Sequence, residues 1–131
     1  MDKIPAGTWV IAADGEGARL FRNVGTDVSL QLRQEDFLDL NPADEGPSGI
    51  EPNERWDKQL DEAGFAKQLA KSINAAALKH EFEHLVLFAD PITLGRLRPQ
   101  LHKEVQARLI CDVAKDLRNS PLEDIERALA N

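Results

Sequence analysis

The run from Leu85 to Ala89 constrains the fold more than any other part of the chain. It reads Leu-Val-Leu-Phe-Ala, has no polar member, and is ended by Asp90 and Pro91. Continuous apolar runs of this length are typical of central strands in sheets that are covered on both faces, because neither side of such a strand meets water. The run therefore predicts an interior strand that is flanked by helices.

The first third of the chain predicts three antiparallel strands. Residues 8–13 form a second short apolar run, which the turn pair Asp14-Gly15 ends. The chain returns through residues 18–23, and residues 28–33 then alternate apolar and polar side chains at the period of a strand. A hairpin followed by a third strand is therefore expected.

Helices alternate with strands in the remainder. A stripe of Phe65, Leu69 and Ile73 at spacing four predicts a long helix. The predicted elements are a helix over about 57–79, the strand 85–89, a helix over about 93–104 with a kink or late start at Pro99, a strand over about 108–114, and a last helix after the capping box 120–123. This order, β-β-β-α-β-α-β-α, predicts an α/β fold with a ribonuclease-H-like mixed sheet of about five strands.

Composition limits the class of protein. A length of 131 residues predicts one domain over residues 1–131, and no apolar run approaches the about 20 residues that a membrane helix needs. Cys111 is the only cysteine, so a disulfide within the chain is excluded, and its place in a strand favours a small buried side chain. The chain begins without a secretory pattern, so a cytoplasmic location is expected. Residues 41–56 predict a mobile surface loop.

The net charge of −7 is concentrated in one segment. Residues 33–62 hold ten acidic and three basic residues, while the rest of the chain holds thirteen of each. Free nucleic acid is therefore not expected as the ligand, since nonspecific binding to phosphates needs a basic surface. Such a surface is predicted only if arginines from several segments, Arg108 among them, gather on one face. The candidate contact residues are Arg19, Arg22, Arg96, Arg98 and Trp56. The alternative for these arginines is ordinary surface ion pairing.

Two patterns predict metal chemistry, and each also has a structural explanation. The first is His80-Glu81-Phe82-Glu83-His84, which satisfies the zinc-protease pattern H-E-x-x-H. That site needs both histidines on one helix, whereas the predicted strand begins directly after His84. A chance match at a junction between helix and strand is therefore favoured, and no metal or cofactor is expected.

The second pattern is the set Asp14, Glu62 and Asp90, which could hold two metal ions for phosphodiester hydrolysis if the fold brought the three carboxylates together. Asp14 stands in a predicted hairpin turn, and Asp90 precedes a proline. Aspartate is common at both kinds of position because its carboxylate bonds nearby backbone amides. Turn formation is therefore favoured over catalysis.

Several segments, in this order, resemble a known family. They are the segments 8–21, 65–70, 82–87, 93–98, 101–105 and 115–117. Together they resemble the bacterial host attachment proteins, which are named for a requirement in attachment to host cells, and distantly the middle domain of archaeal and eukaryotic peptide-chain release factors. The resemblance implies a ribonuclease-H-like domain.

The release factors carry a Gly-Gly-Gln loop that acts in the peptidyl-transferase centre. This chain has no Gly-Gly-Gln, and its nearest loop, Gly46-Pro47-Ser48-Gly49, lacks the glutamine. The resemblance therefore implies a scaffold without peptidyl-tRNA hydrolysis. We expect a non-catalytic binding or adaptor protein with an unknown protein, or the ribosome or its RNA, as partner. The alternative is a metal-dependent hydrolase that uses one of the two residue sets above.

Overall fold

A computed structural model describes residues 4–26, 28–35 and 58–130. Its centre is a five-stranded mixed sheet with the strand order β3-β2-β1-β4-β5. Strand β1 pairs antiparallel with β2 and parallel with β4, and β4 pairs parallel with β5. The strands are β1 (Trp9–Ala13), β2 (Ala18–Asn23), β3 (Leu32–Glu35), β4 (Leu85–Ala89) and β5 (Leu109–Ala114).

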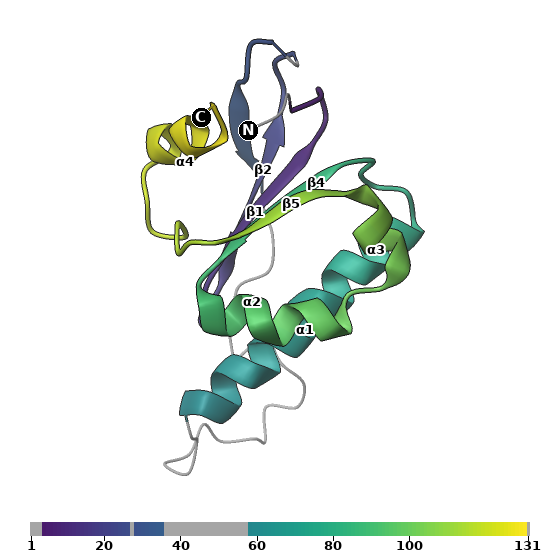
Figure 1. Cartoon of the computed structure of the whole chain (residues 1–131), viewed down its shortest axis with the longest axis vertical. Coiled ribbons are helices and arrows are strands. Elements are labelled where there is room, and N and C mark those ends of the chain that lie inside the picture. Colours follow the sequence, from purple (N-terminus) through teal and green to yellow (C-terminus); the bar gives the residue numbers. More distant parts are fainter. Residues whose placement is uncertain (1–3, 27, 36–57, 131) are drawn as a thin grey trace.

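Helices cover both faces of this sheet. The described helices are α1 (Lys58–Leu78), α2 (Pro91–Leu97), the 3₁₀ helix η2 (Arg98–Gln100), α3 (Lys103–Arg108) and α4 (Leu122–Ala130). Figure 1 shows α1, α2 and α3 on one side of the strands and α4 on the other. The predicted mixed α/β architecture is thus confirmed, and the arrangement is compatible with a ribonuclease-H-like fold.

Strand β4 is the interior strand that its apolar sequence predicts. All five of its residues are buried. Leu85, Leu87 and Ala89 belong to the core beneath α1, α2 and α3, whereas Val86 and Phe88 belong to the core beneath α4. Because successive side chains of a strand point to opposite faces, a strand between two helical layers needs apolar residues at every position.

The third strand lies later in the chain than predicted. It runs from Leu32 to Glu35, and Val28, expected inside it, is 76% exposed. The reason lies in the buried side chain of Asn23. Its amide oxygen accepts hydrogen bonds from the backbone amides of Gly25 and Gln31, at 3.0 and 3.1 Å. The described residues between these two amides, 26 and 28–30, therefore form a loop, which an alternating pattern alone does not reveal.

The predicted helix over 93–104 is interrupted at Pro99, where the sequence predicts a kink or a late start, and it forms separate pieces. Helix α2 begins earlier, at Pro91, where the Asp90 carboxylate caps it by accepting a hydrogen bond from the Thr93 amide. The helix tightens into η2 at Arg98, directly before Pro99, and α3 begins after His102. Proline removes the amide that an α-helix would need there, so the chain divides into three short pieces.

Two further predictions concern the loop 41–56 with Trp56, and the question of a helix that could cross a membrane. The predicted loop 41–56 and Trp56 lie outside the part of the chain that the structure describes. Among the described residues, none of the helices has the length and apolarity that crossing a membrane would require.

Candidate functional site

The structure brings two predicted carboxylates to one edge of the sheet. Ala13 of β1 and Ala89 of β4 are paired in register, so Asp14 and Asp90 follow neighbouring parallel strands at the same end. The side chain of Glu62 on α1 also reaches this edge. The Glu62 carboxyl carbon lies so close to Gly15 that a Cβ atom added to this glycine would be only 2.6 Å from it. The carboxyl ends of parallel strands are where ligands most often bind in open α/β sheets, so this edge is a natural candidate.

Each of these carboxylates has a structural partner. Asp14 accepts hydrogen bonds from the amides of Glu16 and Gly17 and forms an ion pair with Arg118 at 3.3 Å. Glu62 pairs with Arg96 on α2 at 3.6 Å, and one oxygen of Asp90 caps α2. The other oxygen of Asp90 is buried without a hydrogen bond. Within residues 4–26, 28–35 and 58–130, no group of three or more His, Cys, Asp or Glu side chains could hold a metal ion.

The two histidines of the H-E-x-x-H pattern do not share a helix. Helix α1 ends at Leu78, and His80 has a left-handed backbone, with φ of 59°, in the turn that follows. Its Nδ1 lies 3.2 Å from the Arg108 guanidinium. His84 directly precedes β4, and its carbonyl accepts a hydrogen bond from the Trp9 amide. The helical geometry of a zinc-protease site is therefore absent between these residues.

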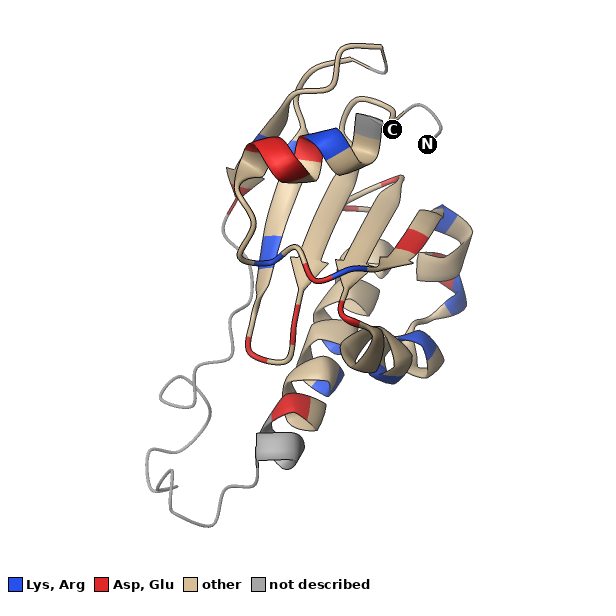
Figure 2. Ribbon diagram, turned by 60° about the vertical axis from the view of Figure 1, so that its left-hand side comes forward, with Lys and Arg blue, Asp and Glu red and all other residues tan. Residues whose placement is uncertain are grey.

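The arginines of the predicted contact surface do not share one face. Arg22 lies over the Trp9 ring, on the α1 side of the sheet, at 6.0 Å from the ring centroid. Arg19 is three residues earlier, on the opposite face, and its guanidinium binds the carbonyls of Arg118 and Ser120 near the start of α4. Figure 2 shows Lys and Arg residues distributed over helices and loops with acidic residues among them.

The other two arginines lie on the helical layer of α1, α2 and α3, and each has an acidic partner. Arg96 pairs with Glu62, and Arg98 forms two hydrogen bonds with Asp112 on β5, at 3.0 and 3.2 Å. The Asp112 carboxylate raises the pKa of the Arg98 guanidinium, because it stabilises the charged form. The local charge of both arginines is thereby largely balanced.

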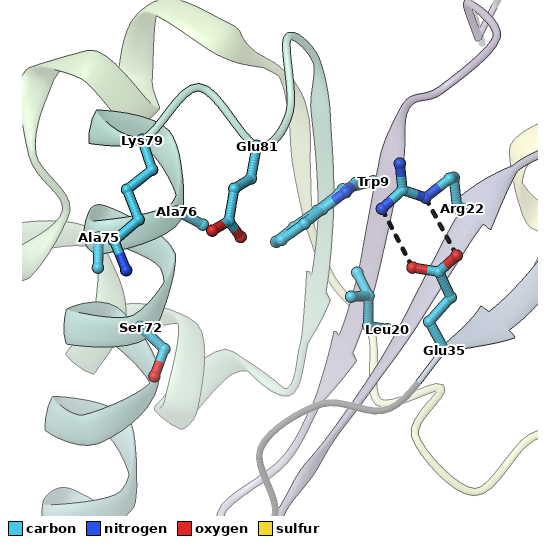
Figure 3. A pocket seen from close by; sticks show the side chains of 9 residues that line it. All are labelled: Trp9, Leu20, Arg22, Glu35, Ser72, Ala75, Ala76, Lys79 and Glu81. Atoms are coloured by element: carbon cyan, nitrogen blue, oxygen red, sulfur yellow. Dashed lines mark hydrogen bonds and ion pairs between the residues drawn. The ribbon is translucent and has the colours of Figure 1, made fainter.

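A groove, which the sequence did not reveal, lies between the end of α1 and the strands β1, β2 and β3. It has a volume of about 450 Å³. Figure 3 shows its two walls: the α1 wall carries polar side chains that include Lys79 and Glu81, and the strand wall carries Arg22 and Glu35, with Trp9 and Leu20 between them. Its lining residues are Trp9, Leu20, Arg22, Glu35, Ser72, Ala75, Ala76, Lys79 and Glu81.

The strand wall is held by a compact charge cluster. Arg22 donates two hydrogen bonds to the Glu35 carboxylate, both of 3.1 Å, and Arg33 adds one of 2.7 Å. The hydrogen bond from Arg33, and then the hydrogen bond and charge of Arg22, lower the pKa of Glu35. The carboxylate is thus ionised at neutral pH and fixes the Arg22 side chain over Trp9.

We expect the Glu35→Gln variant to lose about 1 kcal/mol of unfolding free energy at pH 7, because the three charge-assisted hydrogen bonds weaken at a partly exposed site. A lowered pKa in the folded protein means that this stabilisation is present above about pH 4.5, the ordinary value, and is lost as pH falls through the lowered value. Urea denaturation across this pH range measures it. The exposed Glu83→Gln change is the control, and a Glu35→Gln deficit that persists at low pH would contradict the assignment.

The groove was missed because its walls come from segments far apart in sequence. Alternation along residues 18–23 places Leu20 and Arg22 on one face of a strand, which is a local signal. That Lys79 and Glu81 would face them depends on how α1 packs across the sheet. Only the tertiary structure gives that packing.

The fold and these sites define the class of the protein. It is an α/β domain with a mixed five-stranded sheet, in which the parallel strands β1, β4 and β5 run from the centre to one edge, and helices cover both faces. A sequence model of the bacterial archaeo-eukaryotic release factor family 12 matches residues 7–129. The chain therefore belongs to this release-factor-like family. No curated protein matches the chain.

Proposed function

We propose that this protein is a non-catalytic adaptor that contacts the ribosome in the bacterial cytoplasm through its release-factor-like domain. The observation that carries the proposal is the family match, which spans residues 7–129 in a chain without a single Gly-Gly pair. A Gly-Gly-Gln loop is the part that release factors use for hydrolysis. A domain that keeps the scaffold and lacks this loop is suited to binding.

The chemistry at the sheet edge supports a non-catalytic role. Asp14, Glu62 and Asp90 each accept a hydrogen bond or an ion pair from a neighbouring element. A two-metal hydrolase needs carboxylates that converge on two ions about 3.5–4 Å apart. Side chains that hold a turn, a helix cap and an inter-helix ion pair have a sufficient structural reason to be present.

The distribution of charge is compatible with a contact to ribosomal RNA. The acidic excess lies in residues 33–62, and the remaining residues carry equal numbers of acidic and basic side chains. Arg98 is the best exposed of the proposed contact arginines on the helical layer, with 57% of its side chain accessible. A contact of this kind depends on salt, because binding phosphates releases counterions. In this proposal, a role in attachment to host cells is an indirect result of the adaptor activity.

Co-sedimentation tests the ribosome contact. We expect the purified protein to pellet with bacterial ribosomes at low salt and to be released as salt rises, and we expect Arg98→Gln to weaken this binding. Arg127→Gln is a matched control, since Arg127 is also an exposed arginine paired with an aspartate, but on α4. Failure of the wild-type protein to pellet at low salt would dismiss the ribosome contact, and equal losses in the two variants would remove Arg98 from it.

Thermal unfolding with metal ions tests the non-catalytic part. We expect Mg²⁺, Mn²⁺ and Zn²⁺ to leave the midpoint of unfolding unchanged. A ligand that binds only the folded state must raise its stability, so a functional metal site would produce a shift. A stabilisation that disappears in Asp90→Ala or His84→Ala would overturn the non-catalytic assignment and favour a metal-dependent hydrolase.

A further inference from the structure

The groove described above carries two kinds of charge. On its strand wall, the positive charge of Arg22 is already matched by Glu35 through two hydrogen bonds. On its α1 wall stand one cation and one anion, Lys79 and Glu81. In the described part of the chain, neither of these two side chains forms a hydrogen bond or an ion pair. The groove thus presents one open positive and one open negative group.

The turn after α1 fixes the positions of these two residues. The backbone amide of Lys79 donates to the Ala75 carbonyl, and that of Glu81 donates to the Ala76 carbonyl, at 3.0 and 2.9 Å. His80, between them, adopts a left-handed backbone. Figure 3 shows the Glu81 carboxylate turned toward Trp9 and the Lys79 amine beside Ala75. Two opposite charges are therefore held on one wall by a defined turn.

Two largely buried apolar side chains lie between the walls. Trp9 and Leu20 line the groove and are only 5% and 3% exposed. The Trp9 ring packs against Phe82 with centroids 4.8 Å apart, so it is held in place from behind. An apolar surface with a small number of placed polar groups is typical of pockets for small molecules, whose volumes run from about 300 to 1,000 Å³. The volume of about 450 Å³ falls in this range.

We propose that the groove binds a small zwitterion, namely an α-amino acid or a dipeptide with an apolar side chain. The ligand's ammonium group pairs with Glu81, its carboxylate pairs with Lys79, and its side chain lies against Trp9 and Leu20. A ligand with a single charge would form only one of the two ion pairs, which lowers its affinity. This inference stands apart from the ribosome contact.

Tryptophan fluorescence and calorimetry test the proposal. In a Trp56→Phe background, Trp9 is the only tryptophan, so its emission reports on the groove. We expect saturable binding of L-leucine and of L-leucyl-glycine. N-acetyl-L-leucine lacks the ammonium group and L-leucinamide lacks the carboxylate, and each should bind at least about threefold more weakly than L-leucine, as loss of one exposed ion pair predicts.

Two variants assign each charge to its partner. In Glu81→Gln, L-leucine and N-acetyl-L-leucine should bind with similar affinity, whereas the preference for L-leucine over L-leucinamide remains. In Lys79→Gln, L-leucine and L-leucinamide should bind with similar affinity, whereas the preference for L-leucine over N-acetyl-L-leucine remains. Glu83→Gln and Lys67→Gln are matched controls, because both residues are exposed and neither lines the groove.

Two results would overturn the proposal. One is the absence of saturable binding of both L-leucine and L-leucyl-glycine in the Trp56→Phe protein and, by calorimetry, in the wild-type protein. The other is binding whose preference among the analogues is the same in the wild type, Glu81→Gln and Lys79→Gln. Because all four variants change exposed charges, circular dichroism is expected to show the native fold in each.

Discussion

Replacing Phe88 with alanine should lower the free energy of unfolding by about 3–5 kcal/mol, the range for deleting a large buried aromatic side chain. Phe88 is 1% exposed and belongs to the core between the central sheet and α4. Its removal leaves a cavity that the neighbouring strands cannot fill, since β4 is paired with β1 and β5 on its two sides. A domain of this size has a total stability of about 5–15 kcal/mol, so the loss is a large fraction.

Urea denaturation monitored by circular dichroism measures this effect. Ile92→Ala is the control, because Ile92 is 64% exposed at the start of α2 and its truncation should cost less than about 0.5 kcal/mol. Equal losses in the two variants would mean that β4 is not the interior strand on which both cores depend.

Replacing Asn23 with leucine should lower the unfolding free energy by about 3–4 kcal/mol. The side chain is 1% exposed and binds backbone groups from three segments. Its amide nitrogen donates to the carbonyls of Ile4, Pro5 and Thr26, and its oxygen accepts from the amides of Gly25 and Gln31. The Pro5 carbonyl keeps its hydrogen bonds from Thr8, but leucine, which has a similar size, removes the Asn23 partner of the Gly25 and Gln31 amides, which costs about 1–3 kcal/mol for each group that stays buried.

Asn74→Ala is a matched control for this change. Asn74 also binds two backbone groups, the Gln100 carbonyl and the His102 amide, but at a site where water can replace it. Its loss should cost about 1 kcal/mol or less. Hydrogen exchange at residues 24–31 adds a local measurement, since the loop should lose protection in Asn23→Leu. Unchanged protection there would contradict the role assigned to Asn23.

Much of the secondary structure could be predicted from local patterns. The strands near residues 9–13, 18–23, 85–89 and 109–114, and helix α1, lie close to their predicted positions. The main error occurs where a side chain competes with the periodic pattern, because Asn23 diverts the third strand into a loop. The interruption at Pro99 was expected, but the division into three short helices was not.

The candidate site could be predicted only in part. Asp14 and Asp90 were expected near strand ends, and their shared edge follows from parallel pairing of β1 with β4. Their partners Arg118 and Thr93 did not follow from the sequence, nor did the placement of Arg19 and Arg22 on opposite faces. The groove was not predicted at all.

The sequence by itself determined that Leu85 to Ala89 is an interior strand, and with it the separation of His80 from His84. A continuous apolar run of that length, ended by Asp90 and Pro91, is typical of a strand between two covered faces, and the information is contained in consecutive residues. The tertiary structure alone decided which charged side chains are matched and which stay open. Glu35 meets Arg22 across two strands, and Lys79 and Glu81 face them from a helix end, because packing of α1 on the sheet sets those distances.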